Sequence, residues 1–153
     1  MAEFQIVDYP AYTGLVAGTM CAPDALGSEI PRLLGFIWNS NPEAEMTDAP
    51  CVYYLEWEAH AKVECVVPVA PSTAPQGGAT IKDFAATSAF MGVHQGHYQT
   101  LKDTWTELWN EVGRLGLQPS GPPWERYMTD PEEEPDPNNW VTEVYVPVTI
   151  QKF

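Results

Sequence analysis

The chain of 153 residues contains an internal repeat, which restricts its fold more than any other feature of the sequence. The segment VDYPAYTGLVAG, which begins at Val7, matches KDFAATSAFMGV, which begins at Lys82, with an offset of 75 residues between the aspartates (83 − 8). Three more matches follow in the same order: IWN at 37–39 with LWN at 108–110 (offset 71), Pro50 and Tyr54 with Pro123 and Tyr127 (offset 73), and VECVVPV with TEVYVPV (offset 79). Offsets that drift by only a few residues indicate a duplicated unit with insertions in its loops.

The first copy is predicted to consist of a strand, a helix and a hairpin. Residues 4–19 are rich in Val, Tyr and Thr and alternate loosely, which favours a strand. Ser28 is a candidate N-cap for a helix that continues to about Asn39, with Pro31 in its first turn. CVYYLEWE and AKVECVVPV, which begin at Cys51 and Ala61, then form the hairpin.

The second copy repeats this order after PSTAPQGG at 71–78, whose Pro, Gly and Ser residues predict a linker. Residues 79–93 are predicted as a strand, and residues 98–115 as a helix with Gly116 at its C-terminal cap. The apolar stripe of this helix is assigned to the core: Leu101, Trp105, Leu108, Trp109, Val112 and Leu115. A second hairpin, from Pro122 to Phe153, closes the chain around a long acidic loop.

These elements predict an α+β fold with one domain over residues 1–153: pseudo-repeat 1 at 1–70, the linker at 71–78 and pseudo-repeat 2 at 79–153. A three-stranded sheet with one helix cannot bury both of its faces alone, so the two copies are expected to pair about a pseudo-two-fold axis. We therefore expect a mostly antiparallel curved sheet with two long helices and a cleft between the halves. Such clefts are preferred ligand sites.

Composition and charge exclude several classes of function. The chain is 44% hydrophobic and 12% aromatic, which suffices for a sizeable core. Seven basic and 21 acidic residues give a net charge of −14, which disfavours nucleic acid and anionic membranes as partners and attracts organic cations. No run approaches the roughly 20 apolar residues of a membrane span, and MAEFQIVDYP lacks the regions of a signal peptide. We therefore expect a cytoplasmic protein.

No cofactor and no metal site are predicted. The three cysteines are odd in number and show no CxxC spacing, so reduced thiols are expected rather than disulfides or a zinc site. His94 and His97 have no Cys or acidic ligand at a useful spacing, and we assign both to an exposed turn or a helix cap. The acidic run DPEEEPD at 130–136 lacks the glycine and spacing of an EF-hand. The sequence also lacks GxSxG, P-loop and GxGxxG motifs.

The closing hairpin carries the candidate site. Successive side chains of a strand point to opposite faces, so Glu125 shares a face with Tyr127, and Glu143 shares one with Tyr145. The valines at 144, 146 and 148 form an apolar face that suits packing against a helix. Two interpretations are open: the carboxylates among tyrosines form the wall of a pocket, or they face water on a half-exposed sheet.

The GHY turn before the second helix, the segment GPPWERYMTDPEEEP and the ending TEVYVPV resemble, in this order and spacing, the GyrI-like small-molecule-binding domain. This family is also known as the bacterial transcription activator effector-binding domain. The similarity covers nearly the whole chain and is most specific in its last third. It implies duplicated SHS2-like units whose cleft takes bulky, often cationic and aromatic drugs, with aromatic side chains along it and a glutamate at its floor.

The resemblance also suggests which residues contact a ligand. By position, Glu125 and Glu143 match the two glutamates of the family's closing hairpin, and either is a candidate for the floor. The candidates for the aromatic lining are Tyr54, Tyr127, Tyr145 and Phe90, together with Tyr12 and Trp38, and packing in the core is the alternative for each. The sequence shows no helix-turn-helix region before Phe4 and no basic segment, so we expect a stand-alone domain that does not bind DNA directly.

Three functions follow from these observations. The first is the binding of bulky hydrophobic, cationic aromatic small molecules, for sensing or sequestration, because a carboxylate among aromatic rings favours a cation. The second, implied by one branch of the family, is a hydrolase that opens cyclopropane-type genotoxic natural products. In such an enzyme Glu125 or Glu143, with Tyr127, would activate the water. The third is an interaction protein that inhibits a topoisomerase-like partner through its acidic surface.

Overall fold

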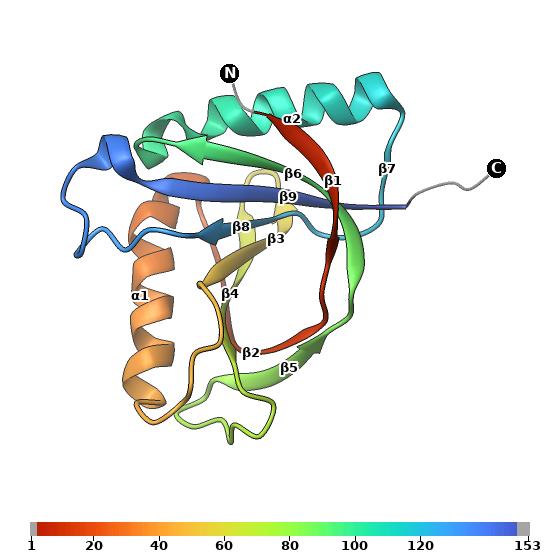
Figure 1. Ribbon diagram of the computed structural model, residues 1–153. Helices are drawn as coiled ribbons and strands as arrows, with labels where there is room; N and C mark the ends of the chain where they lie inside the picture. Colours follow the sequence, from red (N-terminus) through yellow and green to blue (C-terminus); the bar gives the residue numbers. More distant parts are fainter. Residues whose placement is uncertain (1–2, 150–153) are drawn as a thin grey trace. The chain divides into compact units, whose positions relative to one another are not determined.

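The computed structural model describes residues 3–149, which form two helices, nine strands and three short 3₁₀ turns (Figure 1). The strands are β1 (Phe4–Tyr9), β2 (Tyr12–Cys21), β3 (Cys51–Trp57), β4 (Ala61–Val69), β5 (Thr80–Phe84), β6 (Thr87–Gln95), β7 (Gln118–Pro119), β8 (Trp124–Tyr127) and β9 (Val141–Thr149). The helices are α1 (Leu26–Ser40) and α2 (Leu101–Leu115), and the 3₁₀ turns are η1 (Pro23–Ala25), η2 (Tyr98–Thr100) and η3 (Pro137–Asn139).

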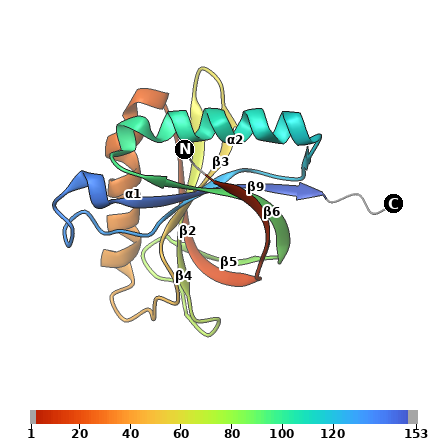
Figure 2. The same cartoon turned by 45° about the horizontal axis from the view of Figure 1, so that its top comes forward.

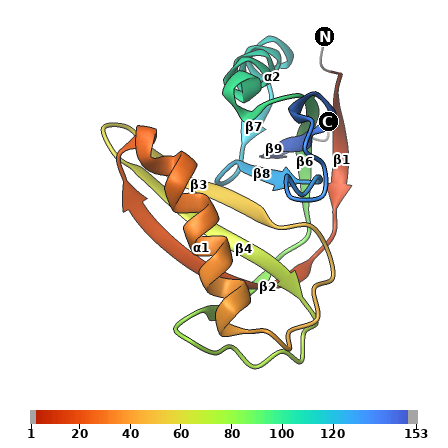
Figure 3. The same ribbon diagram turned by 90° about the vertical axis from the view of Figure 1, so that its left-hand side faces the viewer.

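The described chain divides into two compact units, each with one long helix and a set of antiparallel strands. The α1 unit comprises residues 10–86, and its strand order is β3-β4-β2-β5. The α2 unit comprises residues 3–9 and 87–149, with the order β1-β6-β9-β8 and with β7 paired to β9. Helix α1 packs against β2 and β4 (Figure 3), and α2 packs against β6 (Figure 2). The predicted antiparallel α+β fold with two long helices is confirmed.

The pairing register of the strands reproduces the offsets of the sequence repeat. The pairs Ala17–Cys65 and Val52–Cys65 of the first copy correspond to Gly92–Val144 and Glu125–Val144 of the second. The differences are 75 (92 − 17), 73 (125 − 52) and 79 (144 − 65), which are the offsets of the matched sequence segments. The corresponding strands of the two copies pair in the same register, which agrees with the predicted duplication.

Each predicted long strand is two strands that pair in different units. β1 ends at Tyr9 and pairs with β6, whereas β2 begins at Tyr12 and pairs with β4 and β5. In the second copy, β5 ends at Phe84 and β6 begins at Thr87. The prediction of single strands over 4–19 and 79–93 is therefore wrong. The interruption marks a change of partner strand, which a local pattern of side chains does not encode.

The segment 71–78, which we predicted as a linker, lies inside the α1 unit and connects β4 to β5. The buried amide of Asn41 donates a hydrogen bond to the carbonyl of Gln76 (3.2 Å) and accepts one from the backbone N–H of Gln76 (2.8 Å). Because Asn41 follows the last residue of α1, these two hydrogen bonds fix the segment to the end of that helix.

The ends of the helices differ partly from the prediction. Helix α1 begins at Leu26, and Ser28 is not its N-cap, because the Ser28 hydroxyl donates to the carbonyl of Ala25 (3.0 Å). Pro31 consequently lies inside the helix rather than in its first turn. Gly116 ends α2 in the left-handed conformation (φ 67°), as predicted. Neither helix of the described chain has the length and hydropathy needed to cross a membrane.

The valine face of β9 packs in the core of the α2 unit, as predicted. This core contains Phe90, Leu101, Leu108, Val112, Val144, Val146 and Val148, with Phe4, Trp105 and Leu117 packed against it. Two residues of the predicted stripe are not in the core: Trp109 is 41% exposed and Leu115 is 48% exposed. Trp109 lies at the margin of the stripe and Leu115 is the last residue of α2, so the sheet covers neither position.

Candidate functional site

The hairpin of β8 and β9 carries its two glutamates on opposite faces. In the antiparallel register, Glu125 is opposite Val144, and Arg126 is opposite Glu143. Residues opposite each other point to the same side of a sheet, so Glu125 and Glu143 point to different sides. Glu125 lies on the side of α2, because Trp105 of that helix reaches it. The two carboxylates therefore do not line one surface of the hairpin together.

Glu125 is a buried carboxylate with aromatic hydrogen-bond donors on both oxygens. Glu125 is only 4% exposed to solvent. The indole N–H of Trp105 donates to Oε2 (2.6 Å), and the hydroxyl of Tyr127 donates to Oε1 (2.7 Å). The predicted shared face of Glu125 and Tyr127 is confirmed by the second hydrogen bond. These short, charge-assisted hydrogen bonds hold the carboxylate in one orientation.

Further aromatic rings extend this arrangement. The ring of Tyr98 meets that of Tyr127 edge-on (centroids 5.8 Å apart), and Trp140 lies beside Tyr98 (4.9 Å). Burial raises the pKa of Tyr98, and the negative charges of Asp130 and Glu125 raise it further. The Glu125 cluster is defined here as Tyr98, Trp105, Glu125, Tyr127 and Trp140. It combines one buried negative charge with four aromatic side chains.

Sequence reasoning missed three members of this cluster. Trp105 was assigned to the core, and Tyr98 and Trp140 were not singled out. Tyr98 lies in the GHY turn before α2, and Trp140 ends the loop that precedes β9. Both positions were visible as aromatic residues beside a turn, but only the fold brings these turns to the same end of the β8–β9 hairpin (Figure 1).

Two histidines hold the turn that carries Tyr98. The Nδ1 atom of His97 accepts the backbone N–H of Gln99 (3.0 Å), so His97 caps η2, as predicted. His94 is buried, with its Nδ1 2.7 Å from the hydroxyl of Thr104 and its Nε2 3.1 Å from the carbonyl of His97. The predicted exposure of His94 is therefore wrong, because the residue lies on the face of β6 that α2 covers.

Glu143 has a different environment. Arg126 forms an ion pair with its Oε1 (3.1 Å), and the hydroxyl of Tyr145 donates to the same oxygen (2.7 Å). The latter contact confirms that Glu143 and Tyr145 share a face. Tyr145 stacks on Trp124 (4.9 Å, 7° between planes), and burial, followed by the bond to Glu143, raises its pKa. The charge of Glu143 is thus balanced by a neighbouring guanidinium.

Of the remaining predicted lining residues, one packs in the core of the α2 unit and three belong to the α1 unit. Phe90 packs in the core of the α2 unit. Three belong to the α1 unit: Tyr12 stacks on Phe84, Tyr54 meets Trp57 edge-on, and the indole of Trp38 donates to Met46 Sδ (3.0 Å). Burial raises the pKa of Tyr12, and its neighbours Cys51 and Tyr53 add to this effect.

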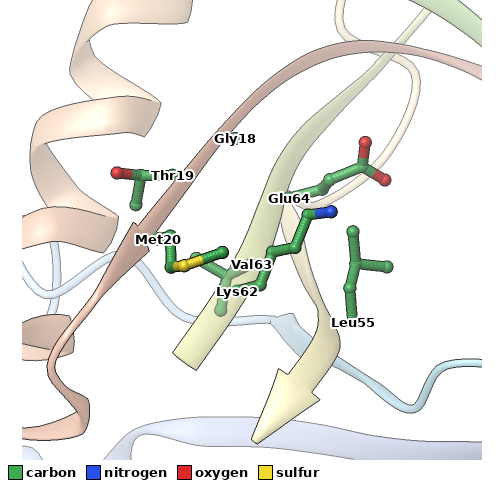
Figure 4. Close-up of a pocket in the computed structure, with 7 residues that line it drawn as sticks. All are labelled: Gly18, Thr19, Met20, Leu55, Lys62, Val63 and Glu64. Atoms are coloured by element: carbon green, nitrogen blue, oxygen red, sulfur yellow. The ribbon is translucent and has the colours of Figure 1, made fainter. Parts of the chain in front are cut away.

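The α1 unit also contains a pocket with a volume of about 260 Å³, whose lining residues are shown in Figure 4. It is lined by Gly18, Thr19, Met20, Leu55, Lys62, Val63 and Glu64. None of these seven residues was predicted as a site residue. Gly18 contributes no side chain to the wall of this pocket, whereas the equivalent position of the second copy (18 + 75) is Val93.

Comparisons with solved structures show that this fold is shared. The crystal structure of the EcmrR C-terminal domain has a TM-score of 0.87 at 19% identity, with 99% of each chain covered. In the cryo-EM structure of an EcmrR–DNA complex, the match covers 58% of the EcmrR chain and 98% of this one, with a TM-score of 0.86 and 19% identity.

Two other structures are similar over most of their length. The structure of SAV2435 bound to tetraphenylphosphonium has a TM-score of 0.71 at 12% identity, with 96% of this chain and 94% of that chain covered. A hydrolase from Listeria innocua has a TM-score of 0.67 at 12% identity, with 96% and 92% covered. At these identities the likeness concerns the fold alone.

Sequence comparison identifies the family. No curated protein sequence matches the chain. A family model, the GyrI-like small molecule binding domain, matches residues 16–149, as the resemblance predicted. Because this match spans most of the 153 residues, the chain belongs to the GyrI-like small-molecule-binding domain family.

Proposed function

We propose that this protein binds bulky hydrophobic cations with aromatic groups at the Glu125 cluster. The observation that carries the proposal is the burial of one carboxylate among aromatic side chains, with Trp105 and Tyr127 donating to its two oxygens. Membership of a small-molecule-binding family supports a small-molecule ligand. SAV2435, which shares the fold, is bound to the bulky cation tetraphenylphosphonium in its structure.

The electrostatics of the cluster favour a cation over a neutral or anionic ligand. A carboxylate loses most of its hydration when it is buried, and a bound cation offsets part of that cost. The faces of Tyr98, Trp105, Tyr127 and Trp140 add cation–π attraction and stacking for a flat, delocalised cation. The net charge of −14 raises the rate at which cations approach.

Comparison of the two copies supports a functional reason for the buried charge. The residue equivalent to Glu125 is Val52 (125 − 73), which is 0% exposed and pairs with Cys65. Valine therefore satisfies the packing of this position in one copy of the fold. A charged residue at the same place in the other copy, with aromatic donors aimed at it, is not required by the architecture.

The contacts favour Glu125 over Glu143 as the residue that attracts the ligand charge. Glu143 already forms an ion pair with Arg126, at 3.1 Å. A ligand cation at Glu143 would therefore meet a guanidinium of the same sign as itself, which disfavours binding there.

Calorimetry and thermal shift with tetraphenylphosphonium test the proposal. We expect saturable binding and a rise in Tm that grows with ligand concentration, because the ligand binds the native state. In Glu125→Gln, which removes the charge and keeps the shape, the Kd is expected to rise by about tenfold or more. Glu107→Gln is the matched control, since it removes the same charge from an exposed position on α2.

The outcomes separate site binding from general attraction to an acidic protein. A Kd for Glu107→Gln within about twofold of the wild type, together with the loss in Glu125→Gln, supports the proposal. Equal losses in the two variants would show that only net charge matters. Absence of binding by tetraphenylphosphonium and by a panel of rhodamine cations would contradict the proposed function.

A second candidate function is hydrolysis of a cyclopropane-bearing alkylating compound. Two features favour it: a hydrolase from Listeria innocua shares the fold, and Tyr127 holds the Glu125 carboxylate in a fixed orientation. Glu125 would accept a proton from a water molecule whose oxygen forms a bond to a ring carbon. A ring C–C bond would break in the same step, its electron pair would pass to an electron-withdrawing group conjugated with the ring, and the proton would finally reside on that group. Mass spectrometry should then show more than one equivalent of water-added, ring-opened product per protein, and binding without such product would reject this candidate.

A further inference from the structure

The hydrogen bonds within the Glu125 cluster bear on the chemical class of cation that the site accepts, an argument that rests on the proposed function. Oε1 and Oε2 of Glu125 each accept a hydrogen bond from a neighbouring side chain, at 2.7 Å and 2.6 Å. Both donors come from regular elements, since Trp105 belongs to α2 and Tyr127 to β8. Each oxygen therefore has one internal donor before any ligand arrives, and access to its remaining lone pair depends on the burial of the residue.

The burial of Glu125 limits how a ligand reaches the charge. The residue is 4% exposed, and the rings of Trp105 and Tyr127 occupy positions next to its oxygens. A hydrogen bond from a ligand requires a donor at roughly 2.7–3.2 Å from an oxygen, in line with a lone pair. Coulomb attraction and cation–π attraction have no such requirement and act through the ring faces at longer range.

The two kinds of cation lose different amounts of hydration on binding. A protonated amine or an N–H-bearing dye gives up hydrogen bonds to water and must replace them in the site. A quaternary ammonium, a phosphonium or a fully alkylated dye has no N–H group and loses none of these bonds. We infer that the Glu125 cluster selects cations without N–H groups over N–H-bearing cations of the same size, because the burial of Glu125 and the side chains of Trp105 and Tyr127 at its oxygens keep a ligand N–H from hydrogen-bonding distance.

Two rhodamine esters form a matched pair of probes. Rhodamine 6G carries two N–H groups on its xanthene core, whereas the ethyl ester of rhodamine B is fully alkylated at the same nitrogens, and both are permanent cations. Fluorescence anisotropy and calorimetry give the ratio of their Kd values for each protein variant. For the wild type, we expect the fully alkylated dye to bind about tenfold more tightly.

Removal of one internal donor should change this ratio. Trp105→Phe takes away the N–H that engages Oε2, and Tyr127→Phe takes away the O–H that engages Oε1. Either variant makes an oxygen available to a ligand N–H, so we expect the preference to fall to about threefold or less. Trp57→Phe is the matched control: the same substitution at an exposed indole of the α1 unit, which is not one of the cluster's residues, should keep the wild-type ratio.

The results distinguish this inference from the proposed function. Equal Kd values for the two dyes in the wild type, or an unchanged ratio in folded Trp105→Phe and Tyr127→Phe, overturn the inference while cation binding stands. Failure of both dyes to bind the wild type overturns the proposed function and the inference together. Circular dichroism and Tm identify variants that do not fold, and the second phenylalanine variant keeps the test decisive if one of them fails.

Discussion

Val52 of β3 and Glu125 of β8 occupy the same position in the two copies of the repeat. Val52 pairs with Cys65, Glu125 pairs with Val144, and the offsets of 73 and 79 are those of the whole strands. One copy thus buries a valine where the other buries a carboxylate. The duplicated fold therefore provides an internal control for the effect of that charge.

Introducing the charge into the first copy should be strongly destabilising. Val52→Glu buries a carboxylate in a position that is 0% exposed and that packs as an apolar site in the α1 unit. We expect the free energy of unfolding to fall by more than about 3 kcal/mol. Urea unfolding measures this change, and a variant as stable as the wild type would show that the position tolerates charge without the aromatic donors.

The reciprocal variant, Glu125→Val, should keep the fold and lose cation binding. Its expected cost is about 1–3 kcal/mol, because the donors on Trp105 and Tyr127 lose their acceptor. Urea unfolding and calorimetry with tetraphenylphosphonium check the two halves of this prediction. Retained affinity in the folded variant would contradict it.

Substitution of Gly92 is expected to destabilise the protein, because the ring of Phe4 lies next to it. A Cβ atom at Gly92 would clash with the ring of Phe4, which packs on the core from the neighbouring strand β1. Gly92→Ala should therefore lower the free energy of unfolding by about 1–3 kcal/mol. A double-mutant cycle with Phe4→Ala tests the cause. In the Phe4→Ala background, the loss of unfolding free energy caused by Gly92→Ala should be smaller by about 1 kcal/mol or more. Equal losses in both backgrounds would show that the clash with Phe4 is not the cause.

The ion pair between Arg126 and Glu143 should be more important for stability than an exposed pair. Both side chains are 19% exposed, and Arg126→Met leaves Glu143 without this partner, at an expected cost of about 3 kcal/mol. Arg114→Met is the matched control, because Arg114 pairs with Glu111 on the surface of α2 and its loss should cost less than about 1 kcal/mol. Similar unfolding free energies for the two variants would contradict the prediction.

Stability should fall at alkaline pH in part because of Cys65. Burial, followed by the nearby Cys51, raises the pKa of the Cys65 thiol to about 12 from an ordinary value of 9.0. Above pH 9 the unfolded chain loses a proton that the native state keeps, so the free energy of unfolding falls as pH rises from 9 towards 12. At pH 10 this loss is about 1 kcal/mol.

The contribution of Cys65 can be isolated by substitution. Cys65→Ala is expected to be less stable than the wild type at pH 7, because it leaves a small cavity, but to lose less stability between pH 8 and 10. Urea unfolding at three pH values measures both slopes. Identical slopes would assign the alkaline loss to other groups, such as Tyr98 and Tyr145, whose pKa values are also raised by burial.

Local patterns predicted much of the structure because they act over a few residues. The alternation of β8 and β9 correctly placed Glu125 with Tyr127 and Glu143 with Tyr145. Gly116 marked the end of α2. The start of α1 was misjudged, because Ser28 has the chemistry of a cap but lies in the first helical turn.

The candidate site was harder to predict from the sequence than the helices and strands were. Trp105 has the same spacing as the core residues of α2, and only its hydrogen bond to Glu125 distinguishes it from them. The difference between the two glutamates depends on Arg126, whose position opposite Glu143 follows from the register of the hairpin.

The sequence by itself determined the duplication, the two helices with the hairpin that follows each, and the family, because each depends on residue types and their spacing along the chain. Tertiary structure alone decided that β1 pairs with β6 and β5 with β2. It also decided that Glu125 is buried beside Trp105 while Glu143 meets a guanidinium. Long-range strand pairing sets these relations, since the partner of a strand and the register of a hairpin select which distant side chains meet.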